Sequence, residues 1–276
     1  MLIGLFLLLL LLFALLWLFL ILPRMGEGAD TGLLRVDYAH RGLHGDGIPE
    51  NSLSAFSRAV RAGYGIELDV RLSKDGAIVV SHDDDLSRTC GAHARVSQLT
   101  LPQIKRIFLK NSTEHIPTLQ EVLALVGGRV PLMIEIKGDR ADPRLLSPLS
   151  ELLDGYMGPF SVISFSPLIL SWFKNYRPSF ARGQLVTSVA KHNRKGSRVA
   201  GFFLSHMLLN FLSRPDFLSV RKDLSNRPSV RLVTRFLRKA GFLWTLSRRE
   251  EYLHCKKQGF FGVFEGFTPP KRQSHH

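Results

Sequence analysis

Four polar clusters in the first third of the chain each end a short apolar run. In chain order they are Ala39-His40-Arg41-Gly42, Pro49-Glu50-Asn51-Ser52, Glu67-Leu68-Asp69-Val70 and Ser81-His82-Asp83. The ends of apolar runs are the places where a parallel barrel exposes reactive side chains. Two histidines, an arginine and spaced carboxylates at such places favour one chemistry, the metal-assisted cleavage of a phosphodiester.

Three carboxylates have the spacing expected of a metal site. Glu67 and Asp69 are two residues apart on a predicted strand, so their side chains point the same way. Glu135, in a later predicted strand, can supply a third carboxylate. Such groups repel each other unless a cation or a proton lies between them. Because ligation by oxygen alone suits Ca²⁺ or Mg²⁺, we predict that one of these cations binds here.

Two histidines are the predicted acid and base of the reaction. His40 and His82 each lie at a strand end, where one can deprotonate an attacking hydroxyl while the other protonates the leaving alkoxide. Arg41 can donate paired hydrogen bonds to phosphate oxygens. Lys137, two residues after Glu135, can neutralise a phosphate beside the metal. The remaining histidines lack such neighbours, and we expect them to be structural or solvated.

The elements that must position these residues alternate between strands and helices. The predicted strands are Val36–Ala39, Ile66–Val70, Leu132–Ile136, Ser161–Phe165, Gln184–Val186, Asp216–Val220, Phe242–Leu246 and Gly262–Phe264. The helices predicted between them are Ser52–Ala62, Thr118–Val126, Pro143–Leu153, Pro167–Tyr176, Arg198–Leu212, Pro228–Ala240 and Arg248–Lys257. Eight strands that alternate with helices predict an α/β fold, the TIM (β/α)8 barrel.

Two departures from a regular barrel are expected. Asp75-Gly76 lies between apolar runs and predicts a hairpin, so that strand Ala77–Ser81 runs antiparallel to the second strand and brings His82 back towards the carboxylates. A small, mostly irregular insertion follows over residues 83–116. The chain also ends soon after Phe264, so the final helix of the barrel is expected to be absent.

The N-terminus is one long apolar segment. Residues 2–22 carry no charge and would form a helix of about 31 Å, which is long enough to cross a bilayer. A secretory signal peptide is the competing interpretation, but no basic residue precedes the segment and no small-residue cleavage site follows it. We predict a transmembrane anchor over 1–23, a linker over 24–35, a barrel over 36–270 and a tail over 271–276. Arg24 and Arg35 place the barrel in the cytoplasm by the positive-inside rule.

The positive charge is concentrated in the second half of the chain. The net charge is +14, and residues 141–276 hold 22 basic and 8 acidic side chains, whereas residues 1–140 hold 15 of each. An anionic partner is therefore expected, and the sequence has no aromatic-plus-basic pattern typical of nucleic-acid binding. In the predicted helix Pro228–Ala240, Arg231, Arg235 and Arg238 share one face, and we predict that this basic surface binds the membrane.

The motifs taken together resemble those of the glycerophosphodiester phosphodiesterase family. The matching residues are His40-Arg41-Gly42, Pro49-Glu50-Asn51-Ser52, Ala55-Phe56, Glu67-x-Asp69-Val70, Asp75-Gly76, Val79-Val80-x-His82-Asp83, Leu86-x-Arg88-Thr89, Ile116-Pro117-Thr118-Leu119 and Glu135-Ile136-Lys137. One departure is Phe264-Glu265-Gly266-Phe267-Thr268-Pro269, where many relatives have an aspartate before the proline. The family fold is a TIM barrel with a small insertion after the second strand.

This resemblance implies a role for each matching residue. A divalent cation would bind Glu67, Asp69 and Glu135, with Glu50 as a further candidate ligand, and His40 and His82 would be the acid/base pair. Arg41 and Lys137 would bind phosphate, and Trp244 would line the alcohol pocket. The implied reaction converts a glycerophosphodiester to glycerol phosphate and an alcohol: the glycerol 2-hydroxyl attacks phosphorus, and water then opens the cyclic phosphate.

Two alternatives fit the sequence less well. The same site could cleave lysophospholipids, as a lysophospholipase D does, and the membrane anchor and apolar stretches such as Val199–Leu204 favour this. A non-catalytic module that binds anionic lipid through its basic half would not need both histidines and three carboxylates. The substrate is thus expected to be a small-molecule or lipid-derived phosphodiester.

Overall fold

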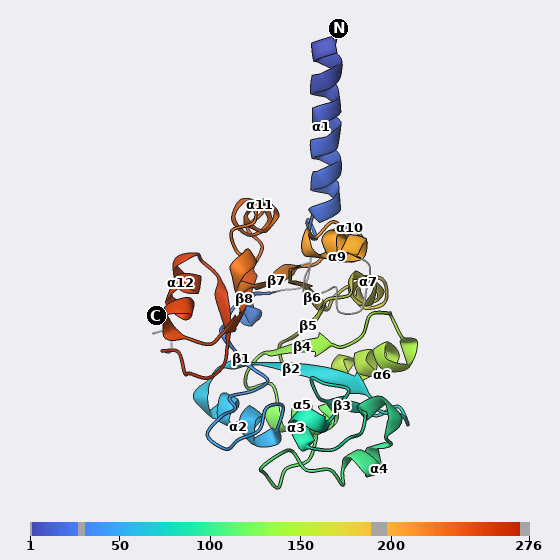
Figure 1. The fold of residues 1–276 in the computed structure, drawn as a ribbon, viewed down its shortest axis with the longest axis vertical. Helices are drawn as coiled ribbons and strands as arrows, with labels where there is room; N and C mark the ends of the chain where they lie inside the picture. The colour runs from blue at the N-terminus through green and yellow to red at the C-terminus, as the bar shows by residue number, and fades with distance from the viewer. Residues whose placement is uncertain (1, 27–30, 189–197, 271–276) are drawn as a thin grey trace.

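The computed structural model of this chain describes residues 2–26, 31–188 and 198–270, which form a barrel and one projecting helix (Figure 1). The barrel strands are β1 (Tyr38–His40), β2 (Gly65–Leu72), β4 (Leu132–Ile136), β5 (Phe160–Ser164), β6 (Ala181–Val186), β7 (Phe217–Arg221), β8 (Gly241–Leu246) and β9 (Phe261–Phe264). Neighbouring strands are parallel, and β1 pairs with both β2 and β9, so the barrel closes. The predicted TIM-type fold is confirmed.

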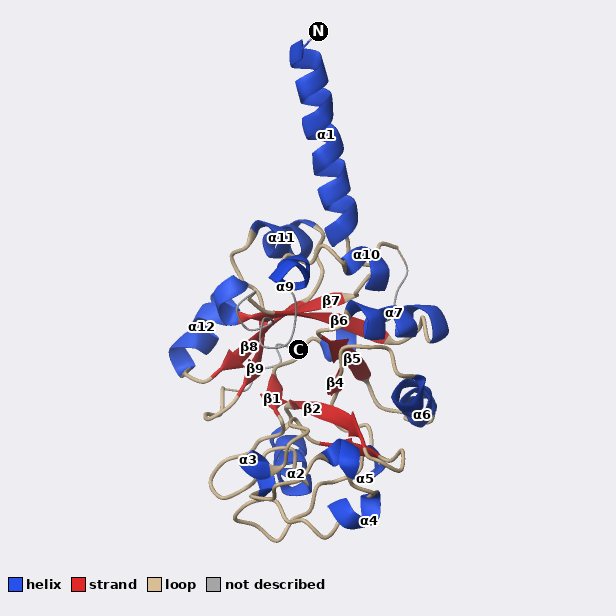
Figure 2. Cartoon of the chain, turned by 45° about the vertical axis from the view of Figure 1, so that its right-hand side comes forward, coloured by secondary structure: helices blue, strands red, loops and turns tan. Residues whose placement is uncertain are grey.

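Helices surround the barrel (Figure 2). They are α2 (Leu53–Ala62), α5 (Leu119–Val126), α6 (Pro143–Asp154), α7 (Pro167–Tyr176), α9 (Arg198–Ser205), α10 (Asn210–Ser213), α11 (Pro228–Arg231) and α12 (Arg249–Lys257). Local signals in the sequence set their limits. For example, the Ser52 hydroxyl accepts a hydrogen bond from the Ala55 amide at the start of α2, and Gly63 adopts φ 71° at its end.

Two predicted helices differ in the structure. The prediction Arg198–Leu212 is wrong in its continuity, because the left-handed Met207 (φ 60°) separates α9 from α10. The prediction Pro228–Ala240 is wrong in its length and form: α11 is followed by a π-helical turn over Leu232–Phe236. The wider turn rotates Phe236 away from the buried face that Val233 occupies, and leaves the Phe236 side chain 78% exposed.

The predicted hairpin and insertion follow β2. Strand β3 (Ile78–Val80) is antiparallel to β2, with Val80 opposite Val70. The insertion contains the short helices α3 (Ser87–Cys90) and α4 (Leu101–Ile104) and a 3-10 turn over Val96–Gln98. It has a small hydrophobic core of its own, formed by Val79, Leu86, Val96, Ile104, Leu109 and Ile116.

The segments before β1 and after β9 pack on the barrel in different ways. Leu34, in the 3-10 turn Gly32–Leu34, and Tyr38 pack with Phe217 and Phe242 inside the barrel, so part of the predicted linker belongs to the packed domain. After β9, residues 265–270 form no helix, as predicted for the end of the chain. Among these residues, Phe267 packs against β9 and α12 through aromatic contacts with Phe264 and Tyr252.

Helix α1 (Leu2–Ile21) projects from one end of the domain (Figures 1 and 2). Its length and composition would allow it to cross a membrane. Its base is fixed to the domain by several contacts: Asn210 and Arg214 donate hydrogen bonds to the carbonyls of Ile21 and Leu22, and Arg24 forms an ion pair with Asp216. The C-terminal end of α1 is therefore packed on the domain.

Candidate active site

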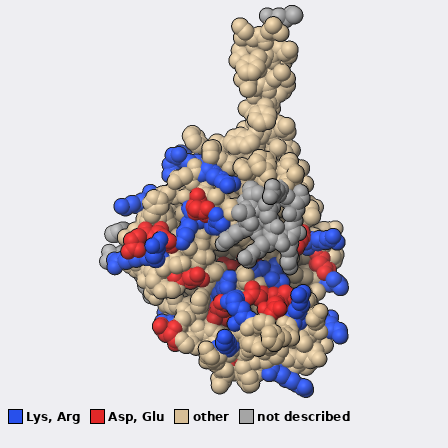
Figure 3. All heavy atoms as spheres, in the orientation of Figure 1, with Lys and Arg blue, Asp and Glu red and all other residues tan. Residues whose placement is uncertain are grey.

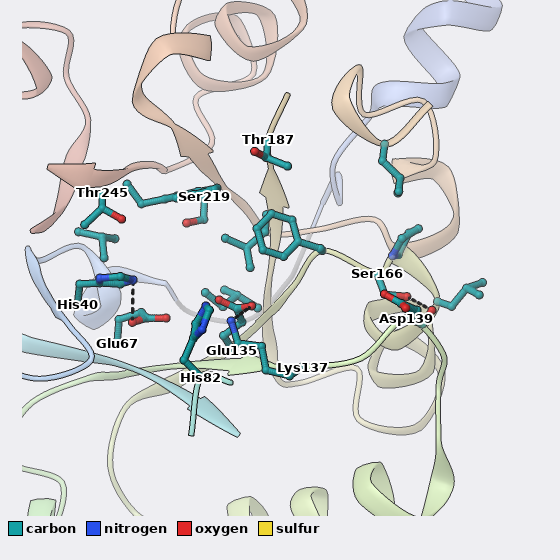
Figure 4. Close-up of a pocket in the computed structure, with 18 of the residues that line it drawn as sticks. His40, Glu67, His82, Glu135, Lys137, Asp139, Ser166, Thr187, Ser219 and Thr245 are labelled. Atoms are coloured by element: carbon teal, nitrogen blue, oxygen red, sulfur yellow. Dashed lines mark hydrogen bonds and ion pairs between the residues drawn. The ribbon is translucent and has the colours of Figure 1, made fainter. Parts of the chain in front are cut away.

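A pocket of about 1000 Å³ lies at the carboxyl ends of the barrel strands (Figure 4). Strand alternation explains its lining, since side chains at every second strand position point into the barrel. Most of the predicted site residues line this pocket: His40, Arg41, Glu67, His82, Glu135, Lys137 and Trp244.

The three predicted metal-binding carboxylates meet in the structure. Glu67, Asp69 and Glu135 are buried and offer oxygens that all lie within 4.8 Å of one another. The register of β2 and β4 brings this about, because Asp69 lies directly opposite Glu135. Burial, and then the charge of Asp69, raises the pKa of Glu67. A cation would relieve this repulsion, so the oxygen donors fit a hard divalent ion.

Lys137 lies against two of these carboxylates. Its Nζ is 2.7 Å from Asp69 Oδ1, and it also donates a hydrogen bond to Glu135. Burial alone would lower the pKa of Lys137, but the charges of Asp69 and Glu135 outweigh burial and raise it. The ammonium therefore stays positive and faces the pocket, where it can meet a phosphate oxygen (Figure 4).

The loop after β1 turns sharply to place Arg41. Arg41 (φ 55°) and Gly42 (φ 81°) are both left-handed, and a Cβ on Gly42 would lie 2.9 Å from the Ala55 Cβ, so only glycine fits. This turn lets the Arg41 backbone amide donate to Glu67 Oε2 at 3.0 Å. The Arg41 guanidinium lies 3.5 Å from Asp69 and can reach a phosphate beside the carboxylates.

The surroundings of His40 favour its charged form. Its Nδ1 lies 2.6 Å from Glu265 Oε2, and its Nε2 lies 3.9 Å from Glu67 Oε2 (Figure 4). Burial lowers the pKa of His40, but the charge of Glu67 and the hydrogen bond with Glu265 outweigh burial and raise it. The charged form of His40 is therefore stabilised in the pocket.

The surroundings of His82 favour its neutral form. Burial, followed by the nearby charge of Lys137, lowers the pKa of His82. Its Nδ1 lies 2.7 Å from Asp83 Oδ1, which orients the ring, and Arg71 holds the His82 carbonyl at 2.7 Å. Two histidines with pKa shifts in opposite directions at one pocket are suited to complementary proton transfers.

Glu50 lies outside the group of three carboxylates. Its oxygens accept hydrogen bonds from Arg41 Nη1 at 2.8 Å and from Arg88 Nη2 at 2.7 Å. Burial raises the pKa of Glu50, but these arginines outweigh burial and bring it down to about 2. The family resemblance made Glu50 a further candidate metal ligand. In the described chain, Glu50 instead pairs with Arg41 and Arg88 and lies outside the group of Glu67, Asp69 and Glu135.

The opposite wall of the pocket is mainly apolar. The Trp244 ring packs edge-on against Phe165, with 5.7 Å between the ring centroids. Further apolar lining comes from the strands and helices of the second half of the chain, with Leu185, Leu204 and Leu212 among its residues. Thr187, Ser219 and Thr245 add polar groups (Figure 4).

Sequence reasoning missed two residues of the site. Asn51 is buried and donates a hydrogen bond from Nδ2 to Asp69 Oδ2 at 2.9 Å, which orients that carboxylate. Glu265, noted only as a departure from the family, contacts His40. Strand alternation could have predicted the position of Glu265. Val263 faces the barrel interior, and Glu265, two residues further on, is expected to point the same way.

Comparisons with known proteins agree with this geometry. The sequence profile of the "Glycerophosphoryl diester phosphodiesterase family" matches residues 40–268. A glycerophosphodiester phosphodiesterase of Caldanaerobacter subterraneus is 32% identical over 237 residues, which cover 82% of this chain and 91% of the relative.

Solved structures are similar as well. A glycerophosphodiester phosphodiesterase of Thermotoga maritima has a TM-score of 0.64 and 29% identity, over 83% of this chain and 94% of that one. A phosphodiesterase of Oleispira antarctica, solved with the product sn-glycerol-3-phosphate, has a TM-score of 0.69 and 24% identity, over 83% of this chain and 92% of that one.

Proposed function

The chain belongs to the glycerophosphoryl diester phosphodiesterase family and hydrolyses glycerophosphodiesters, and from this premise we propose how its side chains divide the work. One observation carries the proposal: three buried carboxylates within 4.8 Å of one another lie beside two histidines whose pKa values are shifted in opposite directions. Glu67, Asp69 and Glu135 hold one divalent cation, Ca²⁺ or Mg²⁺. When bound, the cation neutralises negative charge on the phosphoryl oxygens.

The histidines carry the protons. Neutral His82 takes the proton of the glycerol 2-hydroxyl as its oxygen attacks phosphorus, and protonated His40 gives a proton to the oxygen of the departing alcohol. Water then opens the cyclic phosphate, with the two histidines in reversed roles. Arg41 and Lys137 donate hydrogen bonds to the phosphoryl oxygens, and their charges stabilise the additional negative charge of the transition state.

The substrate class follows from the relatives. The Oleispira enzyme was solved with sn-glycerol-3-phosphate, which is the glycerol phosphate expected as product here. The Caldanaerobacter and Thermotoga relatives are named glycerophosphodiester phosphodiesterases. Their names favour this substrate class over the lysophospholipid alternative. A purely lipid-binding module is not favoured, since the acid/base groups and the carboxylate cluster are both present.

We also propose that α1 is an uncleaved, single-pass anchor with the barrel in the cytoplasm. The support is the uncharged helix of 20 residues and the two arginines, Arg24 and Arg35, that follow it. Protease digestion of intact cells and of inverted membrane vesicles tests this. We expect cleavage of the barrel only in inverted vesicles, and a mature chain that still begins with residue 1 or 2.

The catalytic proposal is tested by metal removal. Chelator should abolish release of glycerol phosphate from a glycerophosphodiester, and either Ca²⁺ or Mg²⁺ should restore it. Asp69→Asn should lower turnover by about 10³-fold, because a bound cation supplies several kcal/mol of charge stabilisation. Full activity in chelator would contradict the cation, and restoration by Zn²⁺ alone would contradict the proposed ions.

A further inference from the structure

The length of α1 fixes where a bilayer surface must lie. Its 20 residues extend about 30 Å, the thickness of the hydrocarbon core, so little of the helix is left over to separate the domain from the lipid. The next residues are already bound to the domain, through Arg214 to Leu22 and Arg24 to Asp216. The lipid headgroups therefore lie at the surface from which α1 emerges.

Three short helices form that surface. In both ribbon views, α9, α10 and α11 lie at the end of the domain from which α1 projects (Figures 1 and 2). Contacts in the structure join these elements: the Phe19 and Phe211 rings lie 5.8 Å apart, and Arg227 donates a hydrogen bond to the Ser205 carbonyl at 2.7 Å. These elements hold the surface in a fixed position relative to the anchor.

The composition of this surface is typical of a membrane interface. Phe236 is 78% exposed, and Phe202 on α9 is 49% exposed. Around Phe236, Arg231, Arg235 and Arg238 are also exposed, and basic side chains gather at the position of α11 beside the base of α1 (Figure 3). Exposed aromatic rings among arginines suit a layer of apolar chains and anionic headgroups.

We propose that this surface, formed by α9, α10, α11 and the π-helical turn Leu232–Phe236, rests on an anionic bilayer. This proposal rests on the part of the proposed function that makes α1 a membrane anchor. The rings of Phe236 and Phe202 enter the interface, and Arg231, Arg235 and Arg238 bind lipid phosphates. Each arginine favours contact with an anionic over a neutral surface by about fivefold.

The catalytic pocket adjoins the same surface. Helix α9 carries Gly201 and Leu204 in the pocket lining and the exposed Phe202 beside them. Leu212 of α10, the helix that holds the base of α1, also lines the pocket. Contact with the bilayer therefore places the pocket next to the lipid surface, where phosphodiesters derived from lipids are released.

Fluorescence quenching in the full chain tests the surface. A fluorophore is attached to the cysteine of Phe236→Cys in a chain that also carries Cys90→Ser; the fully buried Cys255 stays unlabelled. The labelled protein is reconstituted into vesicles that contain phosphatidylglycerol and a lipid-borne quencher. We expect loss of emission at position 236. The matched control is Phe108→Cys in the insertion, where the native side chain is 51% exposed, and its emission should be retained.

Charge reversal separates lipid contact from mere proximity. Arg231→Glu with Arg235→Glu should restore part of the emission at position 236, whereas Arg106→Glu with Lys110→Glu, also exposed but in the insertion, should not. Equal quenching at 236 and 108, or no effect of the arginine reversal, would overturn the proposal. Turnover of a water-soluble glycerophosphodiester should be unchanged in all variants. Flotation with the vesicles measures whether α1 inserts into the membrane. These two measurements detect a failure of the proposed function separately from a failure of the surface contact.

Discussion

The two halves of the chain contribute different kinds of side chain to one pocket. Residues 1–140, with equal numbers of basic and acidic side chains, supply the carboxylates, both histidines, Arg41 and Lys137. Residues 141–276, with 22 basic and 8 acidic side chains, supply most of the apolar wall, and several of their arginines, among them Arg231 and Arg235, are exposed.

This difference shows how charge can serve two purposes in one domain. In the first half, opposite charges are buried together, and each shifts the pKa of its neighbours. In the second half, exposed arginines such as Arg231 and Arg235 have no acidic partner in the described chain, so their field extends into solvent. We therefore expect substitutions of the pocket charges in the first half to change turnover, and substitutions of the apolar wall and the exposed arginines in the second half to change substrate fit and location.

After the loss expected for Asp69→Asn, the largest expected effect is the loss of either histidine. His40→Ala and His82→Ala should each lower kcat by about 10²-fold or more, because a proton transfer loses its partner. Circular dichroism should confirm that both variants fold. His206→Ala is a matched control, since His206 lies outside the pocket lining. A His82→Ala enzyme that retains nearly full kcat would remove His82 from the mechanism.

A second prediction concerns the ion pairs of Glu50 in the first half. Glu50 has a pKa of about 2 in the folded protein, below its ordinary 4.5, so its ion pairs stabilise the fold above pH 4.5 and are lost as the pH falls towards 2. Glu50→Gln should lower the free energy of unfolding at pH 7 by about 2 kcal/mol. Urea unfolding of the full chain in detergent measures this difference, which should shrink towards pH 2. A constant difference at all pH values would contradict this assignment.

Glu265 differs from the other acidic residues of the second half, because it contacts His40, one of the two proposed catalytic histidines. Glu265→Gln removes a charge that raises the pKa of His40, so less His40 is protonated at neutral pH. We expect about a 10-fold fall in kcat/KM and a shift of the alkaline limb of its pH profile to lower pH. Glu265→Asp should recover part of the loss. An unchanged pH profile would mean that Glu265 acts only through packing.

The smallest effect is expected in the apolar wall. Trp244→Phe removes part of a ring that packs on Phe165 without touching the charged groups, so KM should rise about threefold with little change in kcat. Trp172→Phe, on α7 and outside the pocket lining, is the matched control. A large fall in kcat for Trp244→Phe would show that the second half also takes part in the chemical step.

Much of the fold and of the site could be predicted, because both depend on the local periodicity of apolar and polar residues. The alternation that places Glu67 and Asp69 on one face also predicts the strands themselves, and the register of β2 and β4 then brings Glu135 to them. The partner of Glu50 could not be found in this way, because Arg88 is 38 residues away in a separate insertion. The π-helical turn was also missed, because the predicted helix Pro228–Ala240 assumed regular α-helical spacing, whereas Leu232–Phe236 has i→i+5 spacing.

The contacts at the base of α1 have a consequence for how the domain moves. A flexible tether would leave the barrel free to tumble, whereas Arg24, Asn210 and Arg214 join the helix to the domain directly. In a bilayer, the domain would keep only lateral diffusion and rotation about the membrane normal. Its orientational entropy would be lost once, on insertion, and not again at each encounter with a substrate at the lipid surface.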